Sequence, residues 1–445
     1  MAADSSEAWK QIMRHIDAEI ERKFTNRLRS PIKNNTPLGI GAKMQKITLT
    51  ASVVLALTIC SSASGFAQKA NTYQINAAHT GAIELQNDLK LPLRLMWSSG
   101  ISQGGNVTSY PIIAGGKVFV VSGDNGVKGG AWVVALDTER NGANLWSRYL
   151  PGSDGRGRAG ITFLNGRLFA LSYSGLLVFL NPNDGKPVWS VQLPKAFDYP
   201  APPVAHEDTI YVSAAASFER NGALIAVNAT NGEIRWKKNI DSVVTGSPAL
   251  SRDGVFVSTV CGVQQFDAIT GALRWRTPGP CTGWSTLMPV FYSDRIFNRQ
   301  MGSNGQAVRT YQAIDGALTT TSVDQIIFPP AFRGGVGYYT TSEALVARVV
   351  ATGEVLWRFR PKFNKTYLPP IVVNGKVLSI AQGGKLSVLD GLTGAVLDQV
   401  QVGSLLPPSP EDSSTAPIAG ISVSDEGDIV IPYQGWVALV RGGQK

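Results

Sequence analysis

The sequence predicts an all-β protein, an eight-bladed β-propeller whose blades are four-stranded antiparallel sheets. Three observations lead to this prediction. A turn from Asp or Asn to Gly recurs along most of the chain, and four residues later comes an outer-strand position that is usually Trp. These positions repeat about every 43 residues, which is the period of a four-stranded propeller blade. A proline that opens an apolar run keeps the same period, and a sheet accepts proline at the first residue of a strand.

The turn motif is most complete at 267–275, which reads Asp-Ala-Ile-Thr-Gly-Ala-Leu-Arg-Trp. Asp267 can accept hydrogen bonds from the turn amides, and Gly271 can adopt a positive φ without a steric penalty. Trp275 then returns a large flat ring to the sheet. The equivalent outer-strand positions, two of which lack tryptophan, are Trp97, Trp146, Trp189, Trp236, Trp275, Thr320, Trp357 and Asp398.

Residues 1–43 differ in composition from everything that follows. Their apolar residues fall at helical spacing and include Trp9, Ile12 and Ile16. Two interpretations remain open: an amphipathic helix that docks on a partner or a membrane surface, or an upstream extension of a protein whose translation starts at Met44.

Residues 44–67 have the pattern of a secretory signal peptide, with a short basic start, an apolar stretch from Ile47 to Ile59, and small residues before Gln68. We expect cleavage after Ala67 and a periplasmic or secreted protein. An uncleaved anchor is the alternative. Leu-Thr-Ile-Cys at 57–60 resembles a lipoprotein box, but Ile59 stands where a small residue is needed.

Residues 68–90 are polar and irregular, and we expect a leader that lies across one face of the propeller at 91–445. After Asp398 the chain offers only three strand-like runs, 417–423, 428–431 and 436–440. The strand Leu91–Trp97 can supply the fourth and so remove exposed sheet edges. An open solenoid or a sandwich is the alternative, although neither needs the two termini to complete one unit.

Composition narrows the partner class. Beyond residue 67 the chain has only a small excess of Lys and Arg, and no basic run is interleaved with aromatic residues, which argues against nucleic acid. Cys261 falls at a second-to-third turn and Cys281 in a blade-to-blade connection, and these two kinds of segment share one face of a propeller. We therefore predict a Cys261–Cys281 disulfide in an oxidising compartment. Two separate buried thiols are the alternative.

The blade-to-blade connections are the least repetitive segments, and all of them lie on the same face. Arg, Tyr and Trp, which are typical of interface anchors, gather there. We predict a partner-binding surface on this face, with ordinary loop packing as the alternative. Its candidate residues are Arg156, Arg158, Lys195, Tyr199, Trp284, Lys362 and Tyr367.

The pattern Asp-x-x-Thr-Gly-x-x-x-Trp, repeated in phase over about residues 91–440, resembles the tryptophan-docking repeat of pyrroloquinoline-quinone (PQQ)-type propellers. The resemblance implies eight blades with each tryptophan wedged between neighbours. One branch of this family contains quinoprotein dehydrogenases, which hold PQQ over calcium. In the alcohol dehydrogenases the cofactor stacks on a disulfide between adjacent cysteines, and this chain has no adjacent cysteine pair.

The other branch is similar to this chain in its length and in having an export signal. It contains the BamB-like propeller subunit of the bacterial β-barrel assembly machinery, a non-catalytic scaffold that binds its partner through loops on one face. We therefore expect an exported, monomeric scaffold without a cofactor that binds an exported or outer-membrane protein or peptide. The alternatives are a PQQ-dependent dehydrogenase with PQQ and calcium, or a propeller that binds a small ligand.

Overall fold

A computed structural model describes most of the chain beyond residue 69. The described ranges are 70–101, 109–123, 129–152, 159–216, 221–241, 246–259, 262–277, 288–302, 305–321, 326–361, 368–403, 420–433 and 435–443. All of them belong to one compact unit, Ala67–Lys445. The predicted signal peptide and the segment before it lie outside these ranges.

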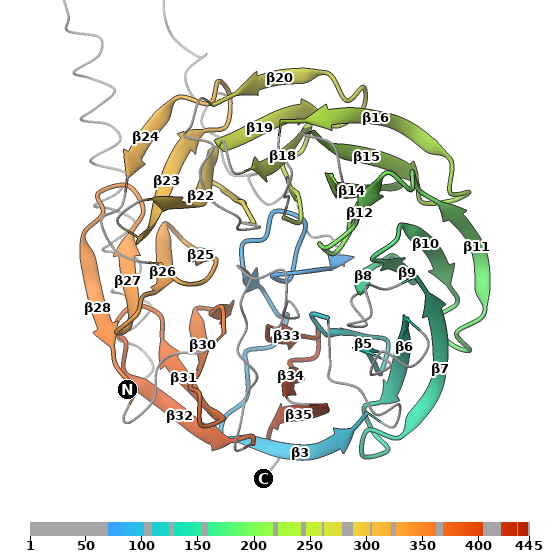
Figure 1. Ribbon diagram of the computed structural model, residues 1–445. Coiled ribbons are helices and arrows are strands. Elements are labelled where there is room, and N and C mark those ends of the chain that lie inside the picture. The colour runs from blue at the N-terminus through green and yellow to red at the C-terminus, as the bar shows by residue number, and fades with distance from the viewer. Residues whose placement is uncertain are drawn as a thin grey trace, which may run out of the picture. The chain divides into compact units, whose positions relative to one another are not determined.

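The described residues form eight antiparallel sheets arranged in a ring, so the predicted eight-bladed propeller is confirmed (Figure 1). We number the blades in chain order from the sheet that begins at β4. In blades 1 to 7 the first strand lies near the ring axis and the fourth on the circumference. The hydrophobic core lies in layers between neighbouring blades; one layer joins Val120 and Val134 of blade 1 to Val437 and Leu439 of blade 8.

The first four blades have the following strands. Blade 1 comprises β4 (Ile112–Ala114), β5 (Lys117–Gly123), β6 (Gly130–Asp137) and β7 (Asn144–Pro151); blade 2, β8 (Ala159–Leu164), β9 (Arg167–Ser172), β10 (Leu176–Leu180) and β11 (Pro187–Gln192); blade 3, β13 (Val204–His206), β14 (Thr209–Ala216), β15 (Gly222–Asn228) and β16 (Ile234–Ile240); blade 4, β17 (Ala249–Leu250), β18 (Gly254–Thr259), β19 (Gly262–Asp267) and β20 (Leu273–Arg276).

The remaining blades follow the same plan. Blade 5 comprises β21 (Val290–Tyr292), β22 (Arg295–Gly302), β23 (Gly305–Gln312) and β24 (Leu318–Thr321); blade 6, β25 (Ala331–Arg333), β26 (Val336–Thr340), β27 (Leu345–Val349) and β28 (Val355–Phe359); blade 7, β29 (Ile371–Val373), β30 (Lys376–Ile380), β31 (Lys385–Asp390) and β32 (Val396–Gln401); blade 8, β33 (Ser422–Val423), β34 (Ile429–Tyr433), β35 (Trp436–Gly442) and β3 (Leu93–Gly100). Three two-residue strands join these sheets: β1 (Ala70–Asn71), β2 (Ala82–Ile83) and β12 (Phe197–Asp198).

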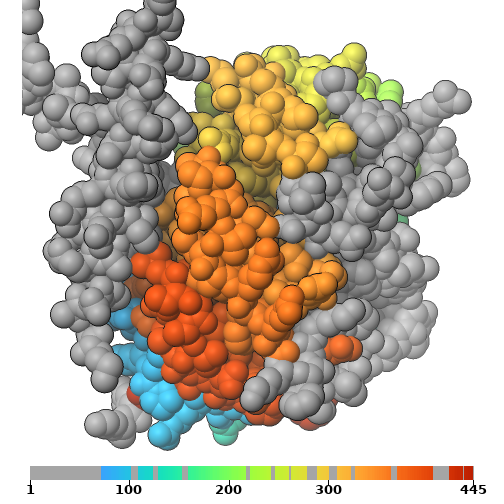
Figure 2. All heavy atoms as spheres, turned by 90° about the vertical axis from the view of Figure 1, so that its left-hand side faces the viewer, coloured from blue at the N-terminus to red at the C-terminus, as the bar shows by residue number. Residues whose placement is uncertain are grey.

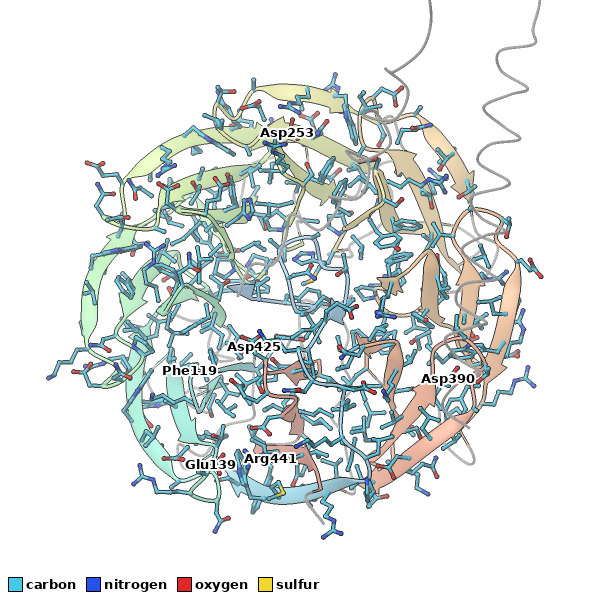
Figure 3. The ribbon with its side chains drawn as sticks, turned by 180° about the vertical axis from the view of Figure 1, so that it is seen from behind. Phe119, Glu139, Asp253, Asp390, Asp425 and Arg441 are labelled. Carbon is cyan, nitrogen blue, oxygen red and sulfur yellow. The ribbon has the colours of Figure 1, made fainter. Side chains whose placement is uncertain are left out.

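Blade 8 combines strands from distant parts of the chain. β3 pairs antiparallel with β35, with Trp97 opposite Leu439, and it runs from Leu93 to Gly100 where the sequence suggested Leu91–Trp97. In Figure 2 the light-blue atoms of this part of the chain lie against the orange-red atoms of the last blades. Arg441 of β35 then bridges Asp428 in its own blade and Glu139 in a turn of blade 1 (Figure 3).

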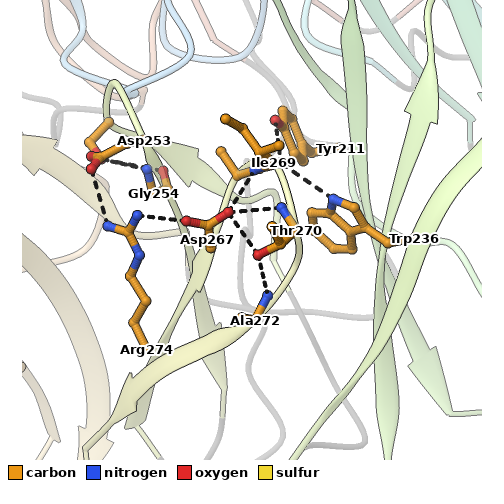
Figure 4. A network of polar contacts seen from close by, with 11 residues as sticks. Tyr211, Trp236, Asp253, Gly254, Asp267, Ile269, Thr270, Ala272 and Arg274 are labelled. Atoms are coloured by element: carbon orange, nitrogen blue, oxygen red, sulfur yellow. Dashed lines mark hydrogen bonds and ion pairs between the residues drawn. The ribbon is translucent and has the colours of Figure 1, made fainter.

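The turn at Asp267 shows why the motif needs these residue types. Asp267 Oδ1 accepts hydrogen bonds from the backbone N–H groups of Ile269 and Thr270, at 3.0 and 2.8 Å, and from the Thr270 hydroxyl (Figure 4). Its Oδ2 accepts from Arg274 at 2.7 Å. The Thr270 amide, with the Arg274 guanidinium as a second contribution, lowers the pKa of Asp267 to about 2. The carboxylate therefore supplies hydrogen-bond acceptors to turn amides that would otherwise have none within the turn.

Each docked tryptophan packs on the turn of the next blade. In five of the six, the indole N–H donates to the carbonyl one residue past the residue that opens that turn: Trp97 to Thr138 (2.9 Å), Trp146 to Pro182 (3.0 Å), Trp236 to Ala268 (3.3 Å), Trp275 to Ala313 (3.0 Å) and Trp357 to Gly391 (2.9 Å). Trp189 packs on Gly232 in the same way, but its indole nitrogen is buried without a hydrogen-bond partner among the described residues. Each ring also covers the turn glycine. A Cβ on Gly316, for example, would lie 2.6 Å from Trp275. The motif glycine is therefore required for close approach as well as for its positive φ.

The two positions without tryptophan have local explanations. Between blades 5 and 6, where Thr320 replaces Trp, Arg295 donates to the Val350 carbonyl at 3.3 Å, the acceptor that an indole would use. Between blades 7 and 8 the next blade has no third-to-fourth turn, because β35 and β3 come from opposite ends of the chain. Asp398 instead accepts the backbone N–H of Leu93 at the start of β3.

This difference supplies a matched pair of substitutions. Gly316 and Gly353 have similar positive φ angles, +73° and +77°, but a Cβ on Gly353 would meet nothing within 4 Å. Alanine adopts this left-handed conformation less readily than glycine, so each substitution should lower the free energy of unfolding by about 1–2 kcal/mol. We expect Gly316→Ala to lose about 1–3 kcal/mol more, because it overpacks against Trp275. Urea unfolding measures both values, and equal losses would contradict the docking role.

The leader crosses the ring axis on the side of the first-to-second turns, where Leu85 bonds to Asn374 and Glu84 to Arg333. Residues 70–85 run inside the ring along the first strands of the blades, where Figure 1 shows them in blue at the centre. β1 pairs with β8 of blade 2, and β2 pairs in parallel with β29 of blade 7. The irregular composition of this segment reflects single contacts to successive blades rather than exposure to solvent. No helix within the described ranges is long and apolar enough to cross a membrane.

Candidate functional site

The connection between blades 2 and 3 is the part of the predicted partner-binding face that the structure describes best. It holds Lys195 and Tyr199. The short strand β12 within it pairs with the end of β14, Phe197 opposite Ala216. The other candidates lie outside the described residues: Arg156, Arg158, Trp284, Lys362 and Tyr367. Cys261 and Cys281 lie outside them too, so their disulfide stays a prediction.

Tyr199 has a different place from the one expected. Its side chain is 2% exposed and packs with Leu193 and Phe197 in the core between blades 2 and 3. Its hydroxyl donates to the Pro194 carbonyl at 2.9 Å, and burial raises its pKa. A Cβ on Gly175 would lie 2.4 Å from the ring, so this glycine makes room for it. Tyr199 therefore anchors the connection and does not present its ring to a partner.

Two lysines are exposed above this anchored loop. Lys195 extends from the connection, and Lys237 extends from the outer strand β16 with its Nζ 5.3 Å from the centre of the Phe197 ring. Such a cation–π contact fixes the Lys237 side chain while its charge stays in water. We call Lys195, Asp198 and Lys237 the blade 2–3 surface. The sequence did not single out Lys237, whose only signal was its place beside Lys238 after Trp236.

The next connection begins with a carboxylate that is already engaged. Asp241 Oδ2 lies 2.6 Å from Arg276 Nη1 and accepts a hydrogen bond from Gln264 at 3.0 Å. Asp198 is half-buried, and Asp324 lies outside the described residues. Over the part of the chain that the structure describes, no group of three or more His, Cys, Asp or Glu side chains is placed to hold a metal ion.

The ring axis holds the protein's own side chains. Tyr73, Gln74 and His79 of the leader are each 0% exposed, and Tyr73 packs edge-on against Tyr110. Gln74 donates to the Pro329 carbonyl at 3.4 Å, and His79 Nδ1 lies 3.0 Å from the Pro289 carbonyl. This packing, together with the lack of an adjacent cysteine pair in the sequence, does not fit PQQ held over calcium.

The repeated turn, the tryptophan that docks on it and the eight-bladed ring define a PQQ-like β-propeller. A family model described as outer membrane protein assembly factor BamB matches residues 129–278, 199–318 and 263–441. The chain belongs to this family.

Relatives and solved structures agree with the assignment. A protein of Moranella endobia named outer membrane protein assembly factor BamB is 26% identical over 216 residues, 42% of this chain and 54% of that protein. One of the same name from Shewanella oneidensis is 24% identical over 340 residues, 69% and 81% of the two chains. The chain thus spans about half the length of the Moranella endobia protein, and a Yersinia pestis relative of that name is matched over 55% of its length.

Among solved structures, BamB from Moraxella catarrhalis has a TM-score of 0.55 at 15% identity and covers 80% of this chain and 99% of its own. A europium-containing methanol dehydrogenase has a TM-score of 0.62 at 15% identity and covers 81% and 88%. At such identities the likeness concerns the fold alone, and both the scaffold and the dehydrogenase branches share it.

Proposed function

We propose that this protein is an exported, non-catalytic scaffold that binds a protein of the outer-membrane assembly apparatus through its blade 2–3 surface. Membership of the BamB family and the names of its relatives support the class of partner. A signal peptide at Met44–Ala67 and a periplasmic location belong to the same proposal.

The observation that carries the choice of surface is the rigid presentation of two exposed cations. Tyr199 and Phe197 fix the connection from inside, and β12 ties it to β14 through the main chain. A surface that is ordered before binding loses less conformational entropy when a partner docks. Lys195 and Lys237 favour a partner with an acidic patch, since complementary charge steers association.

Charge reversal tests the surface. We expect Lys195→Glu combined with Lys237→Glu to reduce co-purification of outer-membrane assembly proteins at least tenfold, since two attractive contacts become repulsive. The melting temperature should change little, because both side chains are exposed. Partner recovery is measured by quantitative mass spectrometry after affinity capture from envelope extracts.

Lys186→Glu is the matched control. Lys186 is also exposed, but it lies in a third-to-fourth turn on the opposite face, paired with Asp184. This variant should recover the same partners as the unmodified protein. Undiminished recovery by the double variant would refute the blade 2–3 surface, whereas an equal loss in both variants would indicate a general charge effect.

A further inference from the structure

Leader carbonyls accept a hydrogen bond from the equivalent backbone N–H in four successive blades. In blades 4 to 7 the N–H two residues past the strand-opening proline points to the axis, and a leader carbonyl accepts it. The pairs are Leu250 with Ala77 (2.8 Å), Phe291 with Ala78 (2.9 Å), Phe332 with Thr80 (2.8 Å) and Val372 with Gly81 (2.7 Å). The repeat thus forms a row of donors that recognises main chain.

Contacts on either side of this row also use backbone groups. β1 and β2 pair with β8 and β29. Asn374, in the first-to-second turn of blade 7, receives the Leu85 N–H and donates to the Leu85 carbonyl at 3.1 Å. Recognition through main-chain bonds depends little on side-chain identity, and side-chain pockets add selectivity.

The last acceptor of the row, Gly81, has no space for a side chain. Gly81 has a φ of +63°, and a Cβ there would lie 2.9 Å from the Ala331 Cβ and 3.2 Å from the Pro370 carbonyl oxygen. A segment that binds here must therefore carry glycine at this position.

The leader itself is an imperfect occupant. Gln74 Oε1 and His79 Nε2 are buried and have no hydrogen-bond partner among the described residues. A buried polar atom without a partner is destabilising. Gln74, Ile75 and His79 also hold positive φ angles of 53°, 73° and 60°, which is unusual for residues other than glycine. A segment without these side chains would avoid both penalties.

We propose that the axial mouth on the face of the first-to-second turns is a binding site for a polypeptide segment that follows the turns of the leader and carries glycine at the position of Gly81. The protein's own leader, residues 72–85, occupies this site in cis and is displaceable. The site lies on the opposite face from the blade 2–3 surface, so it stands whether or not the proposed function is correct.

A peptide of residues 70–85 with a fluorescent label tests the proposal on the full chain by fluorescence anisotropy. The unmodified protein should bind it weakly, because the tethered leader competes at millimolar effective concentration. Gly81→Val in the protein introduces a clash with Ala331 and dislodges that leader. We expect this variant to bind the peptide at least tenfold more tightly. A control peptide that carries Gly81→Val should bind neither protein.

A second variant guards against poor folding of Gly81→Val. Glu84→Lys breaks the exposed ion pair with Arg333 without touching the buried leader residues, and a several-fold gain in peptide affinity is expected. The proposal is overturned if neither variant binds the peptide more tightly than the unmodified protein, or if the Gly81→Val peptide binds as well as the natural one.

Discussion

Replacing Trp357 by alanine is expected to lower the free energy of unfolding by about 3–5 kcal/mol. Its indole is 8% exposed and packs with Tyr338 and Leu389 between blades 6 and 7. The substitution leaves a cavity in that layer and removes the 2.9 Å hydrogen bond to the Gly391 carbonyl. Urea unfolding measures this loss: the midpoint concentration should fall while the m-value stays the same.

Trp436 is the matched control for this experiment. It is 47% exposed at the start of β35, and Trp436→Ala should cost about 1 kcal/mol or less. A comparable loss in both variants would show that tryptophan content, and not docking between blades, stabilises the ring. The contrast separates the repeat tryptophans from one that is merely part of a strand.

The blades were predictable because their signals are local and repeated. Asp267, Gly271 and Trp275 each have a chemical reason for their place within nine residues, and the proline that opens a strand marks the ring axis. The sequence also indicated where tryptophan is missing. It could not show that Arg295 takes over the carbonyl at Val350, because that contact joins residues of two blades and has no pattern of its own.

The leader and the candidate site were harder to predict for a different reason. The bonds that draw residues 77–81 into the axis use backbone carbonyls, which every residue possesses, so composition gives no warning of them. Tyr199 and Lys195 are four positions apart and looked alike as interface residues. β12 and the space above Gly175 turn the tyrosine inward, while the lysine stays in solvent.

Acidification is expected to destabilise the protein through His79. Burial lowers the pKa of this imidazole to about 4, and the hydrogen bond to the Pro289 carbonyl opposes the shift only in part. Between pH 6.5 and 4 the unfolded chain binds a proton at this position and the folded protein does not. Stability therefore falls as the pH falls through this window, by up to about 3 kcal/mol, and the effect is complete below pH 4. Urea unfolding at a series of pH values measures it.

His79→Asn isolates this contribution. Asparagine does not titrate, tolerates a positive φ and can still donate to the Pro289 carbonyl, so the variant should lose most of the decline between pH 6.5 and 4. His206, whose pKa burial also lowers, provides the control: His206→Asn should keep the His79 slope. Parallel curves for His79→Asn and the unmodified protein would contradict the assignment. Because His79 belongs to the leader, acid should expose the amides that bond to residues 77–81 to hydrogen exchange before those of the outer strands.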